Sequence, residues 1–329
     1  MIDTVKFRIP ITERGFEVLL EKSKIHTGYN FVTKQREYTI IKVPINIGSF
    51  SRERTLRIPN DFVEGGSNFA ELELSIPKYV YGHNVSLITV EQFNSACKDI
   101  ERDLREIVGI ETDTLSWIIQ KIDFCYSWKL NSQDELNTYL KIFQNLDYSR
   151  KTTYRYGTSV MYVGSAYSVK SYSKYEEYLK HDLKELGKLN PMLAYEVREL
   201  ATNVLRFEVS LKKQQFQTVF GKQTPHIADI TEETIVSYLN SYLTKLLKIT
   251  NTKISKNDGI YKKLISEYGE VRGRDMFEKY RLWSSSDPTD KEAFKSYSYP
   301  NRYKFIKALN KAGVSLIGDT DFDFKLTIP

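Results

Sequence analysis

Cysteine is scarce in this chain: its 329 residues include only Cys97 and Cys125, which do not form a C-x-x-C pair. A disulfide framework and a cysteine zinc site therefore have no support, and we expect two small buried thiols. No apolar run approaches the ~20 residues that cross a bilayer. The first residues also lack the basic start and apolar centre of a signal peptide. These absences predict a cytoplasmic protein of a bacterial host cell, without a membrane partner.

Several catalytic signatures are missing as well. The chain contains neither a G-x-x-x-x-G-K-[ST] loop nor a G-x-G-x-x-G turn, so nucleotide hydrolysis and dinucleotide binding have no support. No G-x-S-x-G elbow marks a serine hydrolase. The four histidines are scattered and form neither an H-E-x-x-H motif nor an H-x-H pair. The residues left as candidates are acidic side chains, tyrosines and basic side chains.

Positive charge is concentrated near the C-terminal end. The net charge is +6, and residues 245–311 hold 16 Lys/Arg against 8 Asp/Glu, while the rest of the chain is slightly negative. A basic region of this kind fits a nucleic acid or another polyanion as partner. A solvated helical surface explains the same charge equally well.

Hydrophobic periodicity divides the chain into two parts. Up to about residue 213, segments of alternating apolar and polar residues predict strands with helices between them, and later segments fit a helical period. We therefore predict an α+β fold, in which a central antiparallel sheet flanked by helices (1–222) precedes a smaller, mostly helical basic domain (230–329). The predicted strands cover 4–11, 36–45, 68–77, 115–128, 151–157, 159–164, 168–175 and 203–213, and the predicted helices cover 89–109, 132–146, 176–189, 231–248, 259–269, 274–283 and 299–313.

Three acidic residues interrupt apolar strands, namely Glu73, Asp123 and Glu208. Because side chains alternate along a strand, each can project from the polar face of one sheet. Carboxylates that converge there repel one another unless a divalent cation or an arginine neutralises them, and their oxygens suit Mg²⁺ or Mn²⁺. The alternative for each is a solvated position on the sheet, and Arg206 offers Glu208 a plain ion pair.

The passage YVGSAYSVKSYSKYEEYLKH (162–181) is rich in tyrosine. A phenol can act as a covalent nucleophile when a neighbour deprotonates or guides it. In extended geometry, Lys174 lies on the same side as Tyr172 and can stabilise a phenolate or a phosphate. The Y-x-K spacing also occurs by chance. The other tyrosines, Tyr162 and Tyr167 among them, are expected to pack or to stack on unpaired bases.

Short segments spread over most of the chain carry a family resemblance. They are MIDTVKFRIP (1–10), ELELSIPKYVYGHNV (71–85), QKIDFCYSW (120–128), YSKYEEYLKH (172–181), LRFEVSLK (205–212) and NRYKFIKALNKAGVS (301–315). In their order, and in the G-H-N, I-D, Y-x-K and R-F-E elements, these segments resemble the gene II/gene X replication proteins of filamentous phages and plasmids. The stretch MYVGSAYSVKSYSKYEE is also similar to a region of Rep endonucleases from rolling-circle plasmids.

This resemblance implies an initiator of rolling-circle DNA replication. Such an enzyme nicks one strand of a double-stranded origin through a tyrosine, keeps the 5′ phosphate covalently, leaves a 3′-OH primer and later rejoins the displaced strand. By resemblance, Tyr172 is the nucleophile and Lys174 assists it, within a catalytic domain of residues 1–222. Asp123 and Glu208 are the implied ligands of Mg²⁺ or Mn²⁺. Origin DNA, the displaced single strand, a host helicase and a single-strand-binding protein are the implied partners.

Several assignments stay open at this stage. Glu73 is a third metal-ligand candidate with Glu71 as its competitor, and His83 is a fourth candidate that otherwise caps a turn. Because some related nickases use two tyrosines, Tyr175 or Tyr178 is a candidate second nucleophile. The chain lacks the paired-histidine metal motif found in many nickases. A DNA-binding regulator that does not cut, a conjugative relaxase and a dimer on DNA are alternatives.

Overall fold

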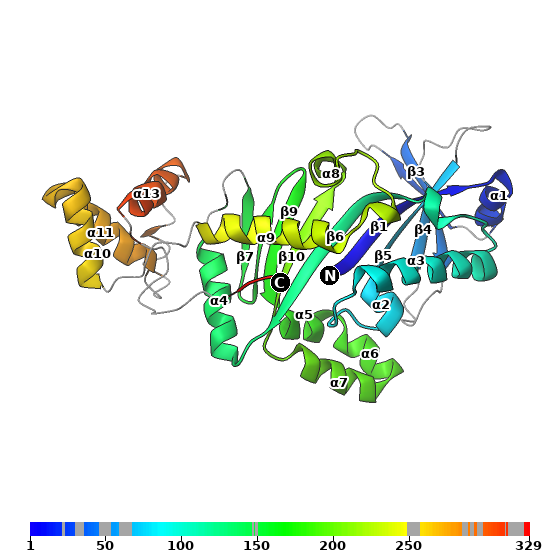
Figure 1. Cartoon of the computed structure of the whole chain (residues 1–329), viewed down its shortest axis with the longest axis horizontal. Coiled ribbons are helices and arrows are strands. Elements are labelled where there is room, and N and C mark those ends of the chain that lie inside the picture. Colours follow the sequence, from blue (N-terminus) through cyan, green and yellow to red (C-terminus); the bar gives the residue numbers. More distant parts are fainter. Residues whose placement is uncertain are drawn as a thin grey trace.

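The computed structural model describes residues 1–21, 24–29, 36–45, 54–58, 68–146, 148, 151–248, 257–284, 289, 293–294, 299–312, 314 and 326–329. Within these residues a ten-stranded antiparallel sheet runs in the order β2-β3-β4-β5-β1-β6-β10-β9-β8-β7 (Figure 1). This sheet confirms the predicted α+β class. The strands are β1 (Ile2–Ile11), β2 (Lys24–Tyr29), β3 (Arg36–Ile45), β4 (Arg54–Ile58), β5 (Asn68–Ser75), β6 (Ile118–Lys129), β7 (Thr152–Tyr156), β8 (Ser159–Val163), β9 (Tyr167–Ser173) and β10 (Val204–Lys212).

The described helices surround this sheet and continue beyond it. They are α1 (Glu13–Glu21), α2 (Ile76–Tyr81), α3 (Val90–Asp103), α4 (Gln133–Asn145), α5 (Lys174–His181), α6 (Leu183–Leu189), α7 (Pro191–Ala201), α8 (Lys213–Phe220), α9 (Glu232–Lys248), α10 (Asn257–Tyr268), α11 (Glu270–Ser284) and α13 (Tyr299–Lys311). None of these described helices is long and apolar enough to cross a bilayer.

Local sequence signals set several helix boundaries. Thr89 and Gln92 form a reciprocal capping box at the start of α3, and Ser132 accepts a hydrogen bond from the Glu135 backbone at the start of α4. The predicted helix over 176–189 is instead two helices, α5 and α6, that meet at Asp182. Since Ser173 caps α5, the extended backbone of β9 ends directly after Tyr172 and Ser173.

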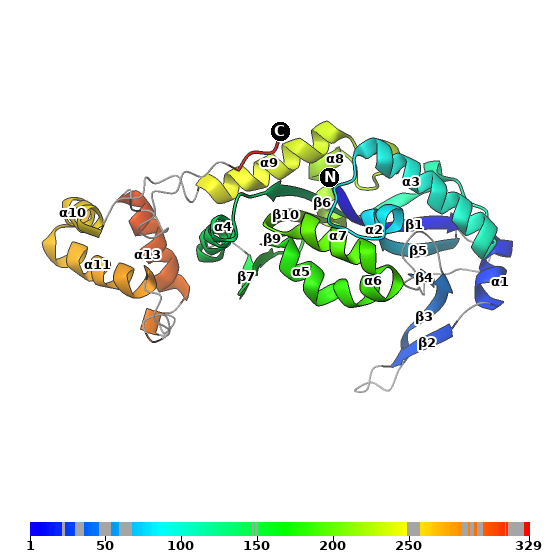
Figure 2. The same ribbon diagram turned by 90° about the horizontal axis from the view of Figure 1, so that it is seen from below.

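The two faces of the sheet have different covers. On the apolar face, Phe93 of α3 stacks on Phe7 of β1, and Phe220 of α8 meets Phe124 of β6 edge to face. Helices α5, α6 and α7 lie on the other side, as Figure 2 shows. These three helices have a small apolar cluster of their own, which includes Tyr178, Leu186 and Val197. The sheet is therefore the middle layer between two helical layers, and its second face is free to carry polar residues.

Helix α9 packs into the main core, although the predicted division assigns it to the C-terminal domain. Ile235, Leu239 and Leu243 of this helix are buried together with residues of the sheet. The end of the chain returns to the same core, where Ile328 is buried and its carbonyl accepts a hydrogen bond from Asn240 Nδ2 at 2.9 Å. The division at 222–230 itself stays a prediction.

Helices α10, α11 and α13 share a separate apolar cluster. Its members include Leu264, Tyr280 and Leu309, all nearly or fully buried. In Figure 1 these helices lie together at one end of the molecule. The residues of the predicted basic region at 249–256, 285–288, 290–292 and 295–298 lie outside the described part of the chain.

The packing of α9 predicts a specific stability loss. We expect Leu239→Ala, at a fully buried position, to lower the free energy of unfolding by about 2–5 kcal/mol, because it leaves a cavity beneath the sheet. Ser241→Ala on the exposed side of the same helix is the matched control and should change little. Urea unfolding followed by circular dichroism measures both. Equal stability of the two variants would show that α9 contributes no buried contact.

Candidate active site

The polar face of three adjacent strands brings the predicted site residues together. In the β6–β10 pairing, Asp123 lies opposite Ser210, and Cys125 lies opposite Glu208. In the β9–β10 pairing, Tyr172 lies opposite Arg206. Side chains at alternate positions of a strand share a face, so these residues all project to the same side. The R-F-E and I-D elements therefore meet at the centre of the sheet, next to the tyrosine of the Y-x-K element.

Tyr172 is hydrogen-bonded to one of the predicted metal ligands. Its hydroxyl donates to Glu208 Oε2 at 3.1 Å. Burial raises the pKa of the Tyr172 phenol well above its usual value, and the nearby Glu208 charge raises it further. The phenol is therefore protonated in this structure, and the carboxylate next to it is placed to accept its proton.

Asp123 and Glu208 repel one another across this face. Burial raises the pKa of Asp123 to about 7, and the Glu208 charge contributes to the rise. Burial also raises the pKa of Glu208, with the Asp3 charge as the next cause. Asp123 Oδ1 accepts a hydrogen bond from Ser210 Oγ, and its other oxygen lies 3.4 Å from Lys121 Nζ. The site thus holds more carboxylate charge than its own cations neutralise fully.

Arg206 is the central cation of the site and is completely buried. Its Nη2 donates to the Val85 carbonyl at 2.6 Å, and its Nε donates to Ser127 Oγ at 2.9 Å. Its Nη1 lies 3.6 Å from Asp3 Oδ2. Arg206 therefore pairs with Asp3 and not simply with Glu208, although its charge also acts on Glu208.

Lys174 lies in a neighbouring buried position rather than beside the phenol oxygen. Its ammonium donates to Asn84 Oδ1 at 2.7 Å and to Glu177 Oε2 at 2.6 Å, and it is 5.8 Å from the centre of the Tyr172 ring. Burial lowers the pKa of Lys174, and the Arg206 charge lowers it further. The expected same-side arrangement assumed extended backbone, but Lys174 is the first residue of α5. Its assisting role stays a prediction.

The G-H-N loop holds both buried cations in place. Gly82 ends α2 with φ 77°, a left-handed conformation that favours glycine. The next residues supply Asn84 to Lys174 and the Val85 carbonyl to Arg206. His83 Nδ1 accepts a hydrogen bond from the Val85 backbone at 3.2 Å. This loop therefore links the helical layer to the polar face of the sheet.

A second lysine covers the nucleophile candidate. Lys170, two residues before Tyr172 and opposite Glu208, places its ammonium 4.0 Å from the centre of the Tyr172 ring. Tyr172 is only 3% exposed. A phosphodiester therefore reaches the phenol only after the surrounding side chains move, and Lys170 is a half-buried, flexible side chain next to it.

The four predicted metal ligands are not all gathered at one point. Asp123 and Glu208 are diagonal neighbours on one face. Glu73 lies on the far side of Lys121, whose ammonium donates to Glu73 Oε1 at 3.0 Å. Its competitor Glu71 pairs with Lys6 at 2.7 Å.

His83 lies in the G-H-N loop, where burial lowers its pKa and the charges of Lys174 and Arg206 lower it further. In the part of the chain that the structure describes, no three His, Cys, Asp or Glu residues are arranged to hold a metal ion. The carboxylate pair Asp123–Glu208 still fits Mg²⁺, which often takes one or two protein carboxylates and completes its shell with water and phosphate oxygens.

The other tyrosines of the passage have structural partners. Tyr178 is fully buried and donates to the Ala194 carbonyl at 2.8 Å. Tyr175 accepts hydrogen bonds from the Arg198 guanidinium at 3.0 and 3.2 Å. Tyr162 is fully buried and donates to the Phe143 carbonyl, and the Tyr167 ring lies 4.6 Å from that of Tyr242. Only Tyr172 among these five contacts a predicted metal ligand through a hydrogen bond described here.

Sequence reasoning missed two residues of the site. Asp3 is 4% exposed, accepts a hydrogen bond from Ser75 Oγ at 2.8 Å and pairs with Arg206. Lys170 was not singled out either. The acidic interruption of the apolar first strand was a usable signal for Asp3, of the same kind that identified Asp123 and Glu208.

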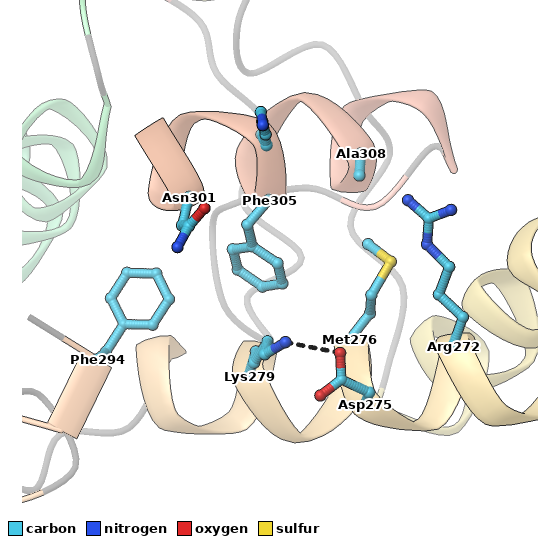
Figure 3. A pocket seen from close by; sticks show the side chains of 9 residues that line it. Arg272, Asp275, Met276, Lys279, Phe294, Asn301, Phe305 and Ala308 are labelled. Carbon is cyan, nitrogen blue, oxygen red and sulfur yellow. Dashed lines mark hydrogen bonds and ion pairs between the residues drawn. The ribbon is translucent and has the colours of Figure 1, made fainter. Parts of the chain in front are cut away.

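A cavity of about 360 Å³ lies elsewhere, between α11 and α13 (Figure 3). The rings of Phe294 and Phe305 line it with their centres 5.7 Å apart. Arg272 lines it as well, and Lys279 is paired with Asp275 at 2.6 Å. None of the predicted catalytic or metal-binding residues contributes to this cavity, so it is separate from the candidate active site.

The fold and the site together define a class of protein: an α+β protein with a buried tyrosine and a carboxylate pair on the polar face of an antiparallel sheet. Residues 1–242 match the family Phage_CRI, described as the N-terminal part of a phage replication-associated protein. The chain belongs to this family of phage rolling-circle replication initiators. Membership of a family of replication initiators implies binding to origin DNA.

Two further comparisons give less. A search of curated protein sequences finds no significant match. Among solved structures, the chain is similar to a rolling circle replication initiator protein from Geobacillus stearothermophilus, with 12% sequence identity over 75% of this chain and 83% of that chain. The TM-score of this superposition is 0.30, which is too low to support an argument about the fold.

The carboxylate pair predicts an unusual pH dependence of stability. An acid whose pKa is raised by folding binds its proton more tightly in the folded state, so stability falls as pH rises. For Asp123 the loss begins above its ordinary pKa of 3.8 and is complete above about 7. In the absence of divalent ions, we expect the wild type to lose thermal stability between about pH 5 and pH 8, and Asp123→Asn to lose clearly less.

Glu111→Gln, at an exposed position, is the matched control and should keep the wild-type profile. Melting temperatures from circular dichroism across this pH range measure all three proteins. Parallel profiles for the wild type and Asp123→Asn would contradict the strained carboxylate pair.

Proposed function

We propose that this protein is a tyrosine nickase that starts rolling-circle replication by cutting one strand of its origin. The observation that carries the proposal is the hydrogen bond from Tyr172 to Glu208, beside Asp123, on the polar face of the sheet. A nucleophile, an adjacent base and a charged group that can hold a cation are the parts that phosphodiester transesterification requires.

In the proposed reaction, the Tyr172 oxygen attacks phosphorus while its proton passes to Glu208. The bond from phosphorus to the 3′ oxygen breaks, and that oxygen takes up a proton from solvent to become the 3′-OH primer. The 5′ phosphate stays on Tyr172 as a phosphotyrosine ester. The raised pKa of Glu208 makes this carboxylate a stronger base than an ordinary one. Attack by the displaced strand's 3′-OH on the ester reverses the step and rejoins the DNA.

A divalent cation, Mg²⁺ or Mn²⁺, would be held by Asp123 and Glu208 and would polarise the phosphoryl oxygens. A carboxylate has two oxygens, so accepting from Tyr172 through Oε2 leaves the other oxygen of Glu208 available. The cation would also lower the mutual repulsion that raises both carboxyl pKa values. Glu73 and His83 remain candidates for a role in this site only after rearrangement, because Lys121 and the G-H-N loop hold them elsewhere.

The basic cations have separate proposed tasks. Lys170 lies nearest the phenol ring and would move onto the incoming phosphate, which uncovers Tyr172. Lys174 would contribute positive potential from its buried position. The helical region with α10, α11 and α13 would bind origin DNA through its Lys and Arg residues, in line with its excess of positive charge. A host helicase and a single-strand-binding protein would act with it.

One observation favours a second candidate function. Because Tyr172 is almost fully buried and its phenol is protonated, a DNA-binding regulator that never cuts would look the same. Such a regulator would bind DNA with strong salt dependence and would need no metal ion.

The test is covalent adduct formation on the replicative-form DNA of the genome that encodes the protein. With Mg²⁺ or Mn²⁺, we expect the wild type to convert supercoiled DNA to nicked circles and to form a detergent-stable protein–DNA adduct. Tyr172→Phe removes the attacking oxygen, so adduct and nicking should fall below detection.

Tyr178→Phe is the matched control, since this tyrosine packs among α5–α7, and Tyr175→Phe tests the second-nucleophile alternative. Both should form the adduct. An adduct with Tyr172→Phe at the wild-type level would reject Tyr172 as the nucleophile. Tight, salt-dependent DNA binding without any adduct would support the regulator.

A further inference from the structure

Two tyrosines stand exposed on the edge strand β7. The side chains of Tyr154 and Tyr156 are 45% and 57% exposed, in contrast to the buried tyrosines of the neighbouring strands. The residue between them, Arg155, points to the opposite face, where its guanidinium donates to carbonyls at the end of α4. Large exposed aromatic rings on a strand have no role in the core, so their position suggests a surface that binds something.

These two tyrosines share a face with the candidate active site. Tyr156 lies opposite Ser159 of β8, which lies opposite Tyr172 of β9. In the same way, Tyr154 is followed across the sheet by Met161 and then by Lys170. Two cross-strand rows therefore lead from the exposed rings to the nucleophile and to the lysine that covers it.

The distance along these rows suits a few nucleotides. Two strand spacings amount to about 10 Å. Stacked bases rise about 3.4 Å each along one strand, so the interval between Tyr156 and Tyr172 corresponds to roughly three bases. A strand with its phosphate at Tyr172 would therefore place nearby bases over the two exposed rings.

The charge of this face also suits a polyanion. Lys212 of β10 lies directly opposite Lys121 of β6, and Lys6 of β1 continues the row. Like charges that face each other across a sheet are destabilising. Lys6 and Lys121 have carboxylate partners, whereas Lys212 is exposed and makes no ion pair among the described residues. Together with Lys170, this row can bind a phosphate backbone that crosses the sheet.

We propose that the polar face of β7–β9, with Tyr154 and Tyr156 as stacking rings and Lys170 as the adjacent cation, binds the single-stranded DNA that flanks the cleaved bond. This inference rests on the proposed function and extends it with a substrate-binding surface. Unpaired bases stack on exposed aromatic rings with little regard to sequence. A duplex keeps its bases paired and stacked inside, so the same rings select the single strand.

Binding is tested without cutting. The parent is the full-length Tyr172→Phe protein, and the probe is a fluorescein-labelled oligothymidylate of about 20 nucleotides, followed by fluorescence anisotropy. We expect the double variant Tyr154→Ala/Tyr156→Ala to bind this probe about tenfold or more weakly. Tyr154→Phe/Tyr156→Phe keeps the rings and should bind within about twofold of the parent. A fluorescein-labelled duplex of the same length should bind equally well to all three.

Tyr195→Ala is the matched control, because Tyr195 is 65% exposed on α7 and lies outside this face. It should bind the probe like the parent. The inference is overturned if the double alanine variant binds the single strand as tightly as the parent, or if the duplex and the single strand lose affinity equally. Because anisotropy does not depend on cutting, failure of the tyrosine nickase proposal shows separately, as absence of the adduct in the wild type.

Discussion

A buried guanidinium organises the polar face of the sheet. Arg206 is completely removed from solvent, and such a charge is costly unless other charges and hydrogen bonds compensate it. Here the compensation comes from Asp3 on the first strand, Ser127 on the central strand and the Val85 carbonyl after α2. Segments separated by about 120 residues must therefore be in place before Arg206 is satisfied, and the site is complete only when the whole sheet has formed.

The same charge sets the electrostatics of its neighbours. Arg206 lowers the pKa of Lys174 after burial has already done so, and it opposes the rise of the pKa of Glu208. Against it stand Asp3, Asp123 and Glu208, whose repulsion keeps the two site carboxyls easy to protonate. A protonated phenol beneath a lysine is a resting arrangement. In the proposed mechanism, phosphate and a divalent cation supply the charges that convert it to a reactive one.

Sequence patterns predicted the sheet because alternation survives in a half-buried strand, as in β1, β6 and β10. They also identified Asp123 and Glu208, since a carboxylate inside an apolar strand is unusual whatever its partners. They could not place Lys174, because whether Lys174 continued the strand or began a helix depended on the Ser173 cap. Glu73 depended on a long-range contact with Lys121, and the role of Asp3 depended on Arg206, more than 200 residues away. The packing of α9 on the sheet is equally a property of tertiary structure.

The central claim is that this polar face is the reaction centre and that Tyr172 is its nucleophile. The most direct measurement is peptide mapping by mass spectrometry of the wild-type protein after nuclease digestion of its covalent DNA adduct. The account predicts a residual nucleotide on the peptide that contains Tyr172, attached through the phenolic oxygen. A nucleotide found on Tyr175, Tyr178 or any other residue, with Tyr172 unmodified, would contradict it.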